Sequence, residues 1–229
     1  MIHYLLGMLL VFCLVFNPMG VRDGIKDFFR GDPVGSAAED SDPAWRLVLV
    51  NSNNLWEKDP DIKLKYLSNG LAVDRRMYPD LQEMMDDARA AGLSPVICSA
   101  YRTVKDQEEI FDRRVERSIE EGMPREEAEA EAAKWVAYPG TSEHHTGLAV
   151  DIVSLDYQVL DSGQENTPEQ RWLMENSWKY GFILRYPSGK SHITGISYEP
   201  WHYRYVGRDV AEEIFFSGLT LEEYLEENR

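Results

Sequence analysis

Two segments of the chain combine histidines with acidic residues at spacings that could bind a metal. Residues 142–151 read SEHHTGLAVD, and residues 199–205 read EPWHYRY. A catalytic zinc ion takes about three histidine or carboxylate ligands and keeps one position open for water. His144, Asp151 and His202 can supply those ligands. Because the metal would activate the water, the pattern indicates hydrolysis without a serine or cysteine nucleophile.

Such a site also needs a carboxylate that takes a proton from water and passes it to the leaving amine. Glu199, three residues before His202, can do this. The chain has no H-E-x-x-H motif, and Pro200 disfavours a helix here. We expect Glu199 in a loop that leads into the strand of His202, because residues three apart on a regular strand face opposite ways. His145 stands beside His144, so the residues alone leave a one-residue shift of this ligand open.

The hydrophobic pattern predicts the elements that must position these residues. Helices are expected at 79–91, about 104–121, 124–136, from 167 to near 181, and from 220. Strands are expected at 46–50, 95–99, 147–153, 182–186 and 202–206. Helices gather in the first half and strands in the second. The predicted class is therefore α+β, with helices flanking a small antiparallel sheet that carries the zinc site.

The N-terminal residues differ from the rest of the chain. Residues 4–16 are apolar and uncharged, a length that suits a signal-peptide core better than a bilayer span of about 20 residues. Residues 31–44 are small, polar and rich in proline and glycine, as in a linker. We expect a signal peptide or membrane anchor at 1–20, a linker at 21–44 and a catalytic domain at 45–229. A buried helix of a cytoplasmic protein is the alternative for the apolar segment.

The composition excludes some classes of protein. The formal net charge of −16 would repel phosphates, so we expect no nucleic-acid partner. A hydrophobic content of 43% is enough for a folded core. The two cysteines, Cys13 and Cys98, form no disulfide framework, so stability must come from core packing, helped by a metal.

The chemical residues also fall into blocks that resemble a known family. The pattern S-x-H-x-x-G-x-A-x-D at 142–151, followed by E-x-x-H at 199–202, resembles the VanY-type zinc D-Ala-D-Ala carboxypeptidases. Upstream, SAYRT at 99–103 with Gln107 is similar to a third block of that family. The three blocks occur in the family's order and cover roughly residues 46–207, most of the expected domain.

The resemblance implies a role for each residue of the site. It implies a zinc ion on the three ligands named above, with Glu199 as catalytic base, and its spacing favours His144 over the neighbouring histidine. It implies that Arg102 binds the carboxylate at the end of the substrate, for which a planar, permanently charged guanidinium is suited. Ser142 and Gln107 are expected to orient the peptide by hydrogen bonds.

The reaction that follows is removal of the C-terminal D-alanine from peptidoglycan stem peptides, outside the cytoplasm of a bacterium, by an enzyme expected to be monomeric. Two hydrolytic alternatives stay open: an L,D-carboxypeptidase acting on tetrapeptide stems and a peptidoglycan endopeptidase. Arg102 favours an exopeptidase, because an internal bond offers no terminal carboxylate. A non-catalytic wall-binding module is a further alternative, which the presence of Glu199 disfavours.

Overall fold

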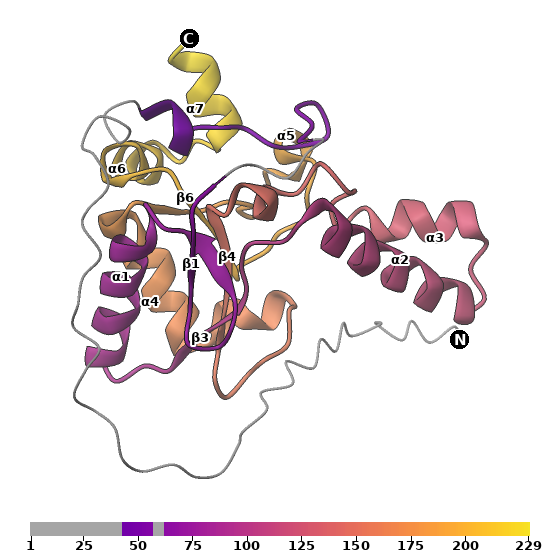
Figure 1. Ribbon diagram of the computed structural model, residues 1–229, viewed down its shortest axis with the longest axis horizontal. Coiled ribbons are helices and arrows are strands. Elements are labelled where there is room, and N and C mark those ends of the chain that lie inside the picture. The colour runs from indigo at the N-terminus through magenta and orange to yellow at the C-terminus, as the bar shows by residue number, and fades with distance from the viewer. Residues whose placement is uncertain (1–42, 57–61) are drawn as a thin grey trace.

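The computed structural model describes residues 43–56 and 62–229 of the chain (Figure 1). The predicted export segment at 1–20 and almost all of the predicted linker lie outside the described residues. Within the part of the chain that is described, no helix is both long enough and apolar enough to cross a membrane.

The sheet that carries the site has four antiparallel strands in the order β3-β4-β6-β5. Its strands are β3 (Pro95–Ser99), β4 (Ala149–Ser154), β6 (His202–Tyr205) and β5 (Phe182–Leu184). A separate hairpin consists of β1 (Leu64–Tyr66) and β2 (Ala72–Asp74). The predicted α+β class with a small antiparallel sheet is confirmed. The β1–β2 hairpin was not predicted, because three-residue strands carry too little alternation to recognise.

Helices and short 3-10 turns surround the sheet. The helices are α1 (Tyr78–Ala90), α2 (Val104–Glu120), α3 (Arg125–Ala132), α4 (Pro168–Asn176), α5 (Ser191–Thr194), α6 (Arg208–Ser217) and α7 (Leu221–Glu227). The 3-10 turns are η1 (Pro43–Arg46), η2 (Glu143–Thr146), η3 (Ser162–Asn166) and η4 (Ser177–Tyr180). Of these helices, α5 and α6 were not among the predicted elements.

Local sequence signals explain where several helices begin and end. The predicted helix at 79–91 is confirmed as α1, whose buried residues follow helical spacing: Leu81, Met84, Met85 and Ala88. Helix α2 begins at a capping box, in which the Thr103 hydroxyl accepts from the Asp106 amide and the Asp106 carboxylate accepts from the Thr103 amide. The helix predicted at 124–136 is shorter, since α3 ends at Ala132.

Alternation along the strands gives the sheet two different faces. Val150 of β4 and Tyr203 of β6 belong to the main hydrophobic core, where α1 and α4 pack against the sheet. Successive side chains on a strand point to opposite faces. Asp151 and His202 therefore lie on the other face of the sheet, away from this core. The apolar face anchors the strands, and the opposite face is left for polar chemistry.

The predicted strand at 46–50 is wrong. Arg46 ends the turn η1, and residues 47–50 form no ladder with any strand of the described residues. Instead, Nη2 of Arg204 donates to the carbonyl oxygens of Arg46 and Val48, at 3.0 and 2.7 Å. A buried guanidinium thus satisfies carbonyl groups that a neighbouring strand would otherwise satisfy. The leucines that suggested a strand pack into a second core cluster with α6 and α7.

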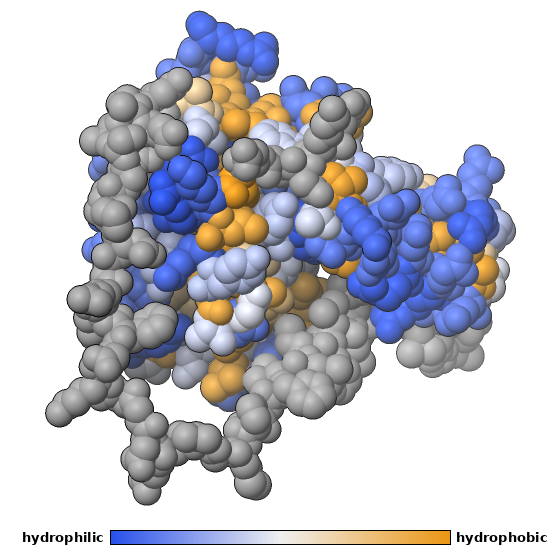
Figure 2. Space-filling model, in the orientation of Figure 1, coloured by the Kyte–Doolittle hydropathy of each residue, from blue (hydrophilic) through white to orange (hydrophobic). Residues whose placement is uncertain are grey.

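Helices α2 and α3 form a hairpin that projects from the body of the molecule (Figure 1). Four small or apolar side chains make a core of its own: Phe111, Val115, Ala128 and Ala132. The outer surface of this hairpin is hydrophilic (Figure 2). The hairpin thus extends beyond the sheet, and residues of α2 line the pocket described below.

Candidate metal centre

Asp151 and His202 meet because of the register between two strands. Their Cα atoms are direct partners across the antiparallel pair of β4 and β6. Residues directly opposite in such a pair point their side chains to the same face. Nδ1 of His202 therefore lies 3.0 Å from Oδ1 of Asp151, although the residues are 51 positions apart. Strand pairing supplies two of the three predicted ligands.

His144 reaches the same point from η2, the turn that precedes β4. The Ser142 hydroxyl caps this turn by accepting from the His144 amide at 3.4 Å, and the turn ends at Gly147, with φ of +70°. Nε2 of His144 lies 3.3 Å from Oδ2 of Asp151, and Nδ1 lies 2.7 Å from the carbonyl oxygen of Ala100. Because a carbonyl oxygen only accepts, Nδ1 carries the hydrogen and Nε2 is available to a metal.

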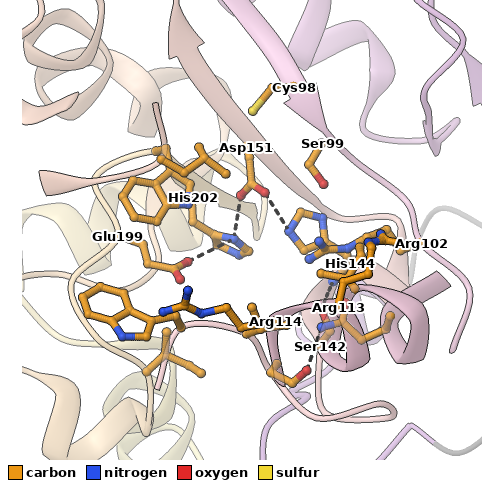
Figure 3. Close-up of a pocket in the computed structure, with 18 of the residues that line it drawn as sticks. Cys98, Ser99, Arg102, Arg113, Arg114, Ser142, His144, Asp151, Glu199 and His202 are labelled. Atoms are coloured by element: carbon orange, nitrogen blue, oxygen red, sulfur yellow. Dashed lines mark hydrogen bonds and ion pairs between the residues drawn. The ribbon is translucent and has the colours of Figure 1, made fainter. Parts of the chain in front are cut away.

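The three side chains have the arrangement of a metal site, and two of them, His144 and Asp151, also have the protonation that metal binding requires. Their ligand atoms lie within 4.8 Å of one another, and all three residues are buried. Figure 3 shows Asp151 between the rings of His144 and His202. Burial lowers the pKa of His144 to about 4. Burial opposes ionisation of Asp151, but the two histidines hold its pKa well below the usual range. A neutral imidazole and an ionised carboxylate are the forms that bind metal, so the residues fit zinc.

His202 is surrounded by carboxylates. Burial alone would lower its pKa, but the hydrogen bond to Asp151 and the nearby carboxylates of Glu143 and Glu199 raise the pKa to about 9. Three carboxylates around one imidazole create a strongly negative environment that favours a cation. Binding a metal at this point would displace the proton that His202 otherwise holds.

Glu199 lies in the loop that leads into β6, as the sequence predicts. Its Oε2 is 3.7 Å from Nδ1 of His202, and its amide donates to the carbonyl oxygen of Tyr186 at 3.2 Å. Burial raises the pKa of Glu199 to about 8; Asp151 acts in the same direction, and His202 and Arg102 oppose it. A carboxyl group with a pKa near neutrality can both accept and return a proton.

All seven residues singled out in the sequence line one pocket of about 800 Å³. Arg102 follows β3 closely, and its amide donates to the carbonyl oxygen of His144 at 3.2 Å. Burial lowers the pKa of Arg102, while the charges of Asp151 and Glu199 oppose this shift. Its Nε is buried without a hydrogen-bond partner. The structure thus brings a guanidinium into the same pocket as the candidate metal ligands, where it can bind an anionic group.

Gln107 and Ser142 line the pocket but also hold the chain in place. Nε2 of Gln107 donates to the carbonyl oxygen of Ala137 at 2.7 Å, whereas its buried Oε1 has no hydrogen-bond partner. The Ser142 hydroxyl already accepts from the backbone in η2. Each side chain therefore has a structural contact, and the amide oxygen of Gln107 is also available to a substrate N–H.

His145 lies outside the ligand group, and its ring contacts the backbone of neighbouring segments. Its Nε2 accepts from the Gly140 amide at 3.2 Å, and its Nδ1 lies 2.8 Å from the carbonyl oxygen of Arg102. Both ring nitrogens are therefore engaged by the backbone. His145 thus joins the loop before η2 to the backbone of Arg102 in the segment that follows β3.

Sequence reasoning missed a buried charged group next to the ligands. Glu143 is 1% exposed, and its Oε1 accepts from Arg185 and Arg204, each at 2.8 Å. Arginines within the apolar runs FILRY and WHYRYV were a signal, because an arginine is rarely fully buried without a partner. The periodicity of these strands gave no indication of which acidic residue that partner would be.

A buried site with two histidines, an aspartate, a neighbouring glutamate and an arginine in one pocket is typical of a metallopeptidase that acts at a chain end. The family model for VanY, D-alanyl-D-alanine carboxypeptidase, matches residues 70–208. The chain belongs to this family.

Individual relatives agree with the family. A D-alanyl-D-alanine carboxypeptidase of Enterococcus faecalis (strain ATCC 700802 / V583) is 45% identical over 207 residues, which are 90% of this chain and 75% of that protein.

Solved structures are also similar. A mutant of the vancomycin resistance D,D-pentapeptidase VanY, from a VanB-type resistance cassette and in complex with Zn(II), is 49% identical with a TM-score of 0.72, covering 79% of this chain and 99% of the other. VanYB in complex with D-alanine-D-alanine is 48% identical with a TM-score of 0.74, covering 81% and 99%. The LD-carboxypeptidase LdcB is 37% identical with a TM-score of 0.62, covering 78% and 84%.

Proposed function

We propose that this chain is a zinc-dependent carboxypeptidase that removes the C-terminal D-alanine from D-Ala-D-Ala peptidoglycan stem peptides. The observation that carries the proposal is the pocket in which the ligand group lies beside both Glu199 and Arg102. The complex of the similar VanYB protein with D-alanine-D-alanine supports the same substrate class. A peptidoglycan substrate places the reaction outside the cytoplasm. The N-terminal tether and the monomeric state stay predictions.

Substrate binding begins with the terminal carboxylate. Arg102 presents a planar guanidinium that forms two parallel hydrogen bonds to a carboxylate, with attraction between full charges. The unpartnered Oε1 of Gln107 can accept from a peptide N–H. These contacts orient the last peptide bond toward the ligand group, and a substrate without a free carboxylate loses the main one.

The chemistry of the step is proton transfer around an attacking water. A zinc ion held by His144, Asp151 and His202 would polarise the scissile carbonyl and make a water molecule more acidic. Glu199 accepts a proton from the water molecule while the water oxygen attacks the carbonyl carbon. Glu199 then donates that proton to the nitrogen of the departing D-alanine as the peptide C–N bond breaks. The products are a shortened stem peptide and free D-alanine.

The test uses the full-length chain with zinc and, separately, a pentapeptide ending in D-Ala-D-Ala and a tetrapeptide stem. Mass spectrometry of the products should show loss of one D-alanine from the pentapeptide only. Glu199→Gln should reduce kcat by several orders of magnitude while zinc content stays near one ion per chain, because Glu199 is not one of the ligands. Zinc is measured in the same samples by atomic emission.

The control variant is Glu129→Gln, which changes an exposed carboxylate of α3 that pairs with Arg125. It should keep full activity. Release from the tetrapeptide only would move the assignment to an L,D-carboxypeptidase with the same site. Zinc-loaded protein that releases nothing from either peptide would contradict the exopeptidase proposal and leave an endopeptidase or a binding module.

A further inference from the structure

Glu143 has an unusual environment for a carboxylate that takes no part in the proposed reaction. Two fully buried guanidinium groups, those of Arg185 and Arg204, both donate to its Oε1 at 2.8 Å. Its other oxygen, Oε2, is buried and has no hydrogen-bond partner. One oxygen therefore accepts two charge-assisted hydrogen bonds, and the second oxygen is directed elsewhere.

The second oxygen faces the third metal ligand. Oε2 of Glu143 lies 3.7 Å from Nε2 of His202, and this Nε2 is likewise buried without a hydrogen-bond partner. On the opposite edge of the ring, Nδ1 lies 3.0 Å from Asp151 and 3.7 Å from Glu199. The ring thus has its Nε2 toward Glu143 and its Nδ1 toward the metal centre.

The other histidine of the ligand group, His144, already has an acceptor on the nitrogen that faces away from the metal site. Nδ1 of His144 faces the carbonyl oxygen of Ala100, an obligatory acceptor, which leaves Nε2 for the metal. A ligand histidine is held in one tautomer by an acceptor on its other nitrogen. The two unpartnered atoms, Oε2 of Glu143 and Nε2 of His202, would complete the equivalent contact for the other histidine.

We propose that Glu143 is a positioning residue that holds the hydrogen of His202 on Nε2, so that Nδ1 presents its lone pair to the metal. Arg185 and Arg204 are the support: by occupying Oε1, they fix the rotation of the carboxylate and keep Oε2 aimed at the ring. This inference rests on the proposed zinc site and adds a residue that controls one of its ligands.

The network reaches well beyond the site. Arg185 also donates to both oxygens of Glu222 on α7, at 2.8 and 2.6 Å. Arg204 donates to the backbone near the start of the domain. Burying so many charges stabilises a fold little or not at all compared with apolar packing. A network of this kind is better explained by the orientation it imposes on His202 than by stability.

The decisive variant is Glu143→Gln. The two arginines require an acceptor, so the amide oxygen of the new side chain stays with them and its NH₂ group turns toward Nε2. An NH₂ donor favours a lone pair on Nε2 and a hydrogen on Nδ1, which is the wrong tautomer for the metal. Zinc affinity, measured by competition with a chelating dye, should fall 10- to 100-fold, a typical effect of such partners.

Glu222→Gln is the matched control, because it changes the other carboxylate partner of Arg185 but does not contact His202. It should alter the unfolding transition of the zinc-free chain while changing zinc affinity less than twofold. Equal losses of zinc affinity in both variants would mean that Glu143 has only a structural role. Unchanged affinity in a folded Glu143→Gln chain would overturn the proposal.

A measurement on the wild-type chain does not depend on the variant folding. In the zinc-loaded, 15N-labelled protein, long-range 1H–15N correlations should show His202 metallated on Nδ1, with a slowly exchanging hydrogen on Nε2. Metallation on Nε2 would overturn the role of Glu143 while leaving the zinc site intact. Failure of the wild-type chain to bind zinc would instead contradict the proposed function.

Discussion

At the scale of single residues, the site combines groups whose protonation is set by their neighbours. His144 is kept neutral by burial, with its pKa lowered to about 4, while burial raises the pKa of Glu199 to about 8. Two carboxylates in one pocket, Asp151 and Glu199, are therefore pushed in opposite directions. Such a separation is typical of acid and base roles divided between similar groups. Asp151 is suited to hold a metal and Glu199 to carry a proton.

Arg102 gives a prediction at this scale. Arg102→Lys keeps the positive charge but removes the planar fork, so only one hydrogen bond to the terminal carboxylate remains. We expect kcat/KM for a D-Ala-D-Ala peptide to fall about 10- to 100-fold, mainly through KM, as for loss of a charge-assisted hydrogen bond. Steady-state kinetics with the free-acid peptide and its C-terminal amide measure this. If the amide is cleaved as well as the acid by the wild type, Arg102 does not bind the carboxylate.

At the scale of elements, the site depends on the junction between η2 and β4. Gly147 ends η2 with φ of +70°, and it separates two proposed metal ligands, His144 before it and Asp151 after it. A Cβ at Gly147 would lie 2.8 Å from Cδ1 of Ile62 and 3.0 Å from the amide nitrogen of Asp74. The turn is therefore packed directly against the β1–β2 hairpin, which explains why a glycine is required here.

Gly147→Ala should destabilise the fold more than the same change at a glycine that has open space around it. The left-handed conformation costs an alanine roughly 1–2 kcal/mol, and the contact with the Asp74 backbone adds to this. Gly92→Ala is the matched control, because Gly92 has φ of +83° but nothing within 4 Å of a new Cβ. Urea unfolding should give a larger loss for Gly147→Ala, with weaker zinc binding only in that variant. Equal losses of unfolding free energy in the two variants would show that packing at this junction contributes nothing to stability.

At the scale of the whole molecule, the proposed metal ligands come from three elements, η2, β4 and β6, of which β6 lies far from the other two in the sequence. Helices α1 and α4 pack with the sheet in the main core, while α6 and α7 pack in a second cluster. The ligand group lies on the polar face of the sheet, in a pocket that residues of α2 also line. A metal ion bound at the ligand group would neutralise the charge of carboxylates that repel one another in the metal-free chain.

Zinc removal should therefore lower the stability of the entire domain. A ligand that binds only the folded chain stabilises it by about 4 kcal/mol at a concentration 1,000 times Kd. For a domain of this size we expect Tm to fall by roughly 10 °C when a chelator removes the metal. Differential scanning calorimetry with and without chelator measures this. His202→Ala provides the control, since its Tm should not respond to zinc; the same Tm with and without metal in the wild type would contradict the prediction.

The sequence by itself determined much of the chemistry and of the local structure. The donor types and their spacing indicated the three side chains that the structure brings together as a candidate metal site, and the predicted position of Glu199 in a loop before a strand agrees with the structure. The capping box at Thr103 and the apolar spacing of α1 are encoded within a few neighbouring residues, so they could be recognised without the fold.

Only the tertiary structure decided which distant groups meet. The register of β4 and β6 places Asp151 opposite His202, and no local pattern encodes the pairing of residues 51 positions apart. The segment at 46–50 looked like a strand, but a buried Arg204 satisfies its carbonyl groups from outside. The partners of Glu143 likewise come from β6 and from the end of β5. Burial makes each of these charges require a partner, and the fold alone determines which one lies within reach.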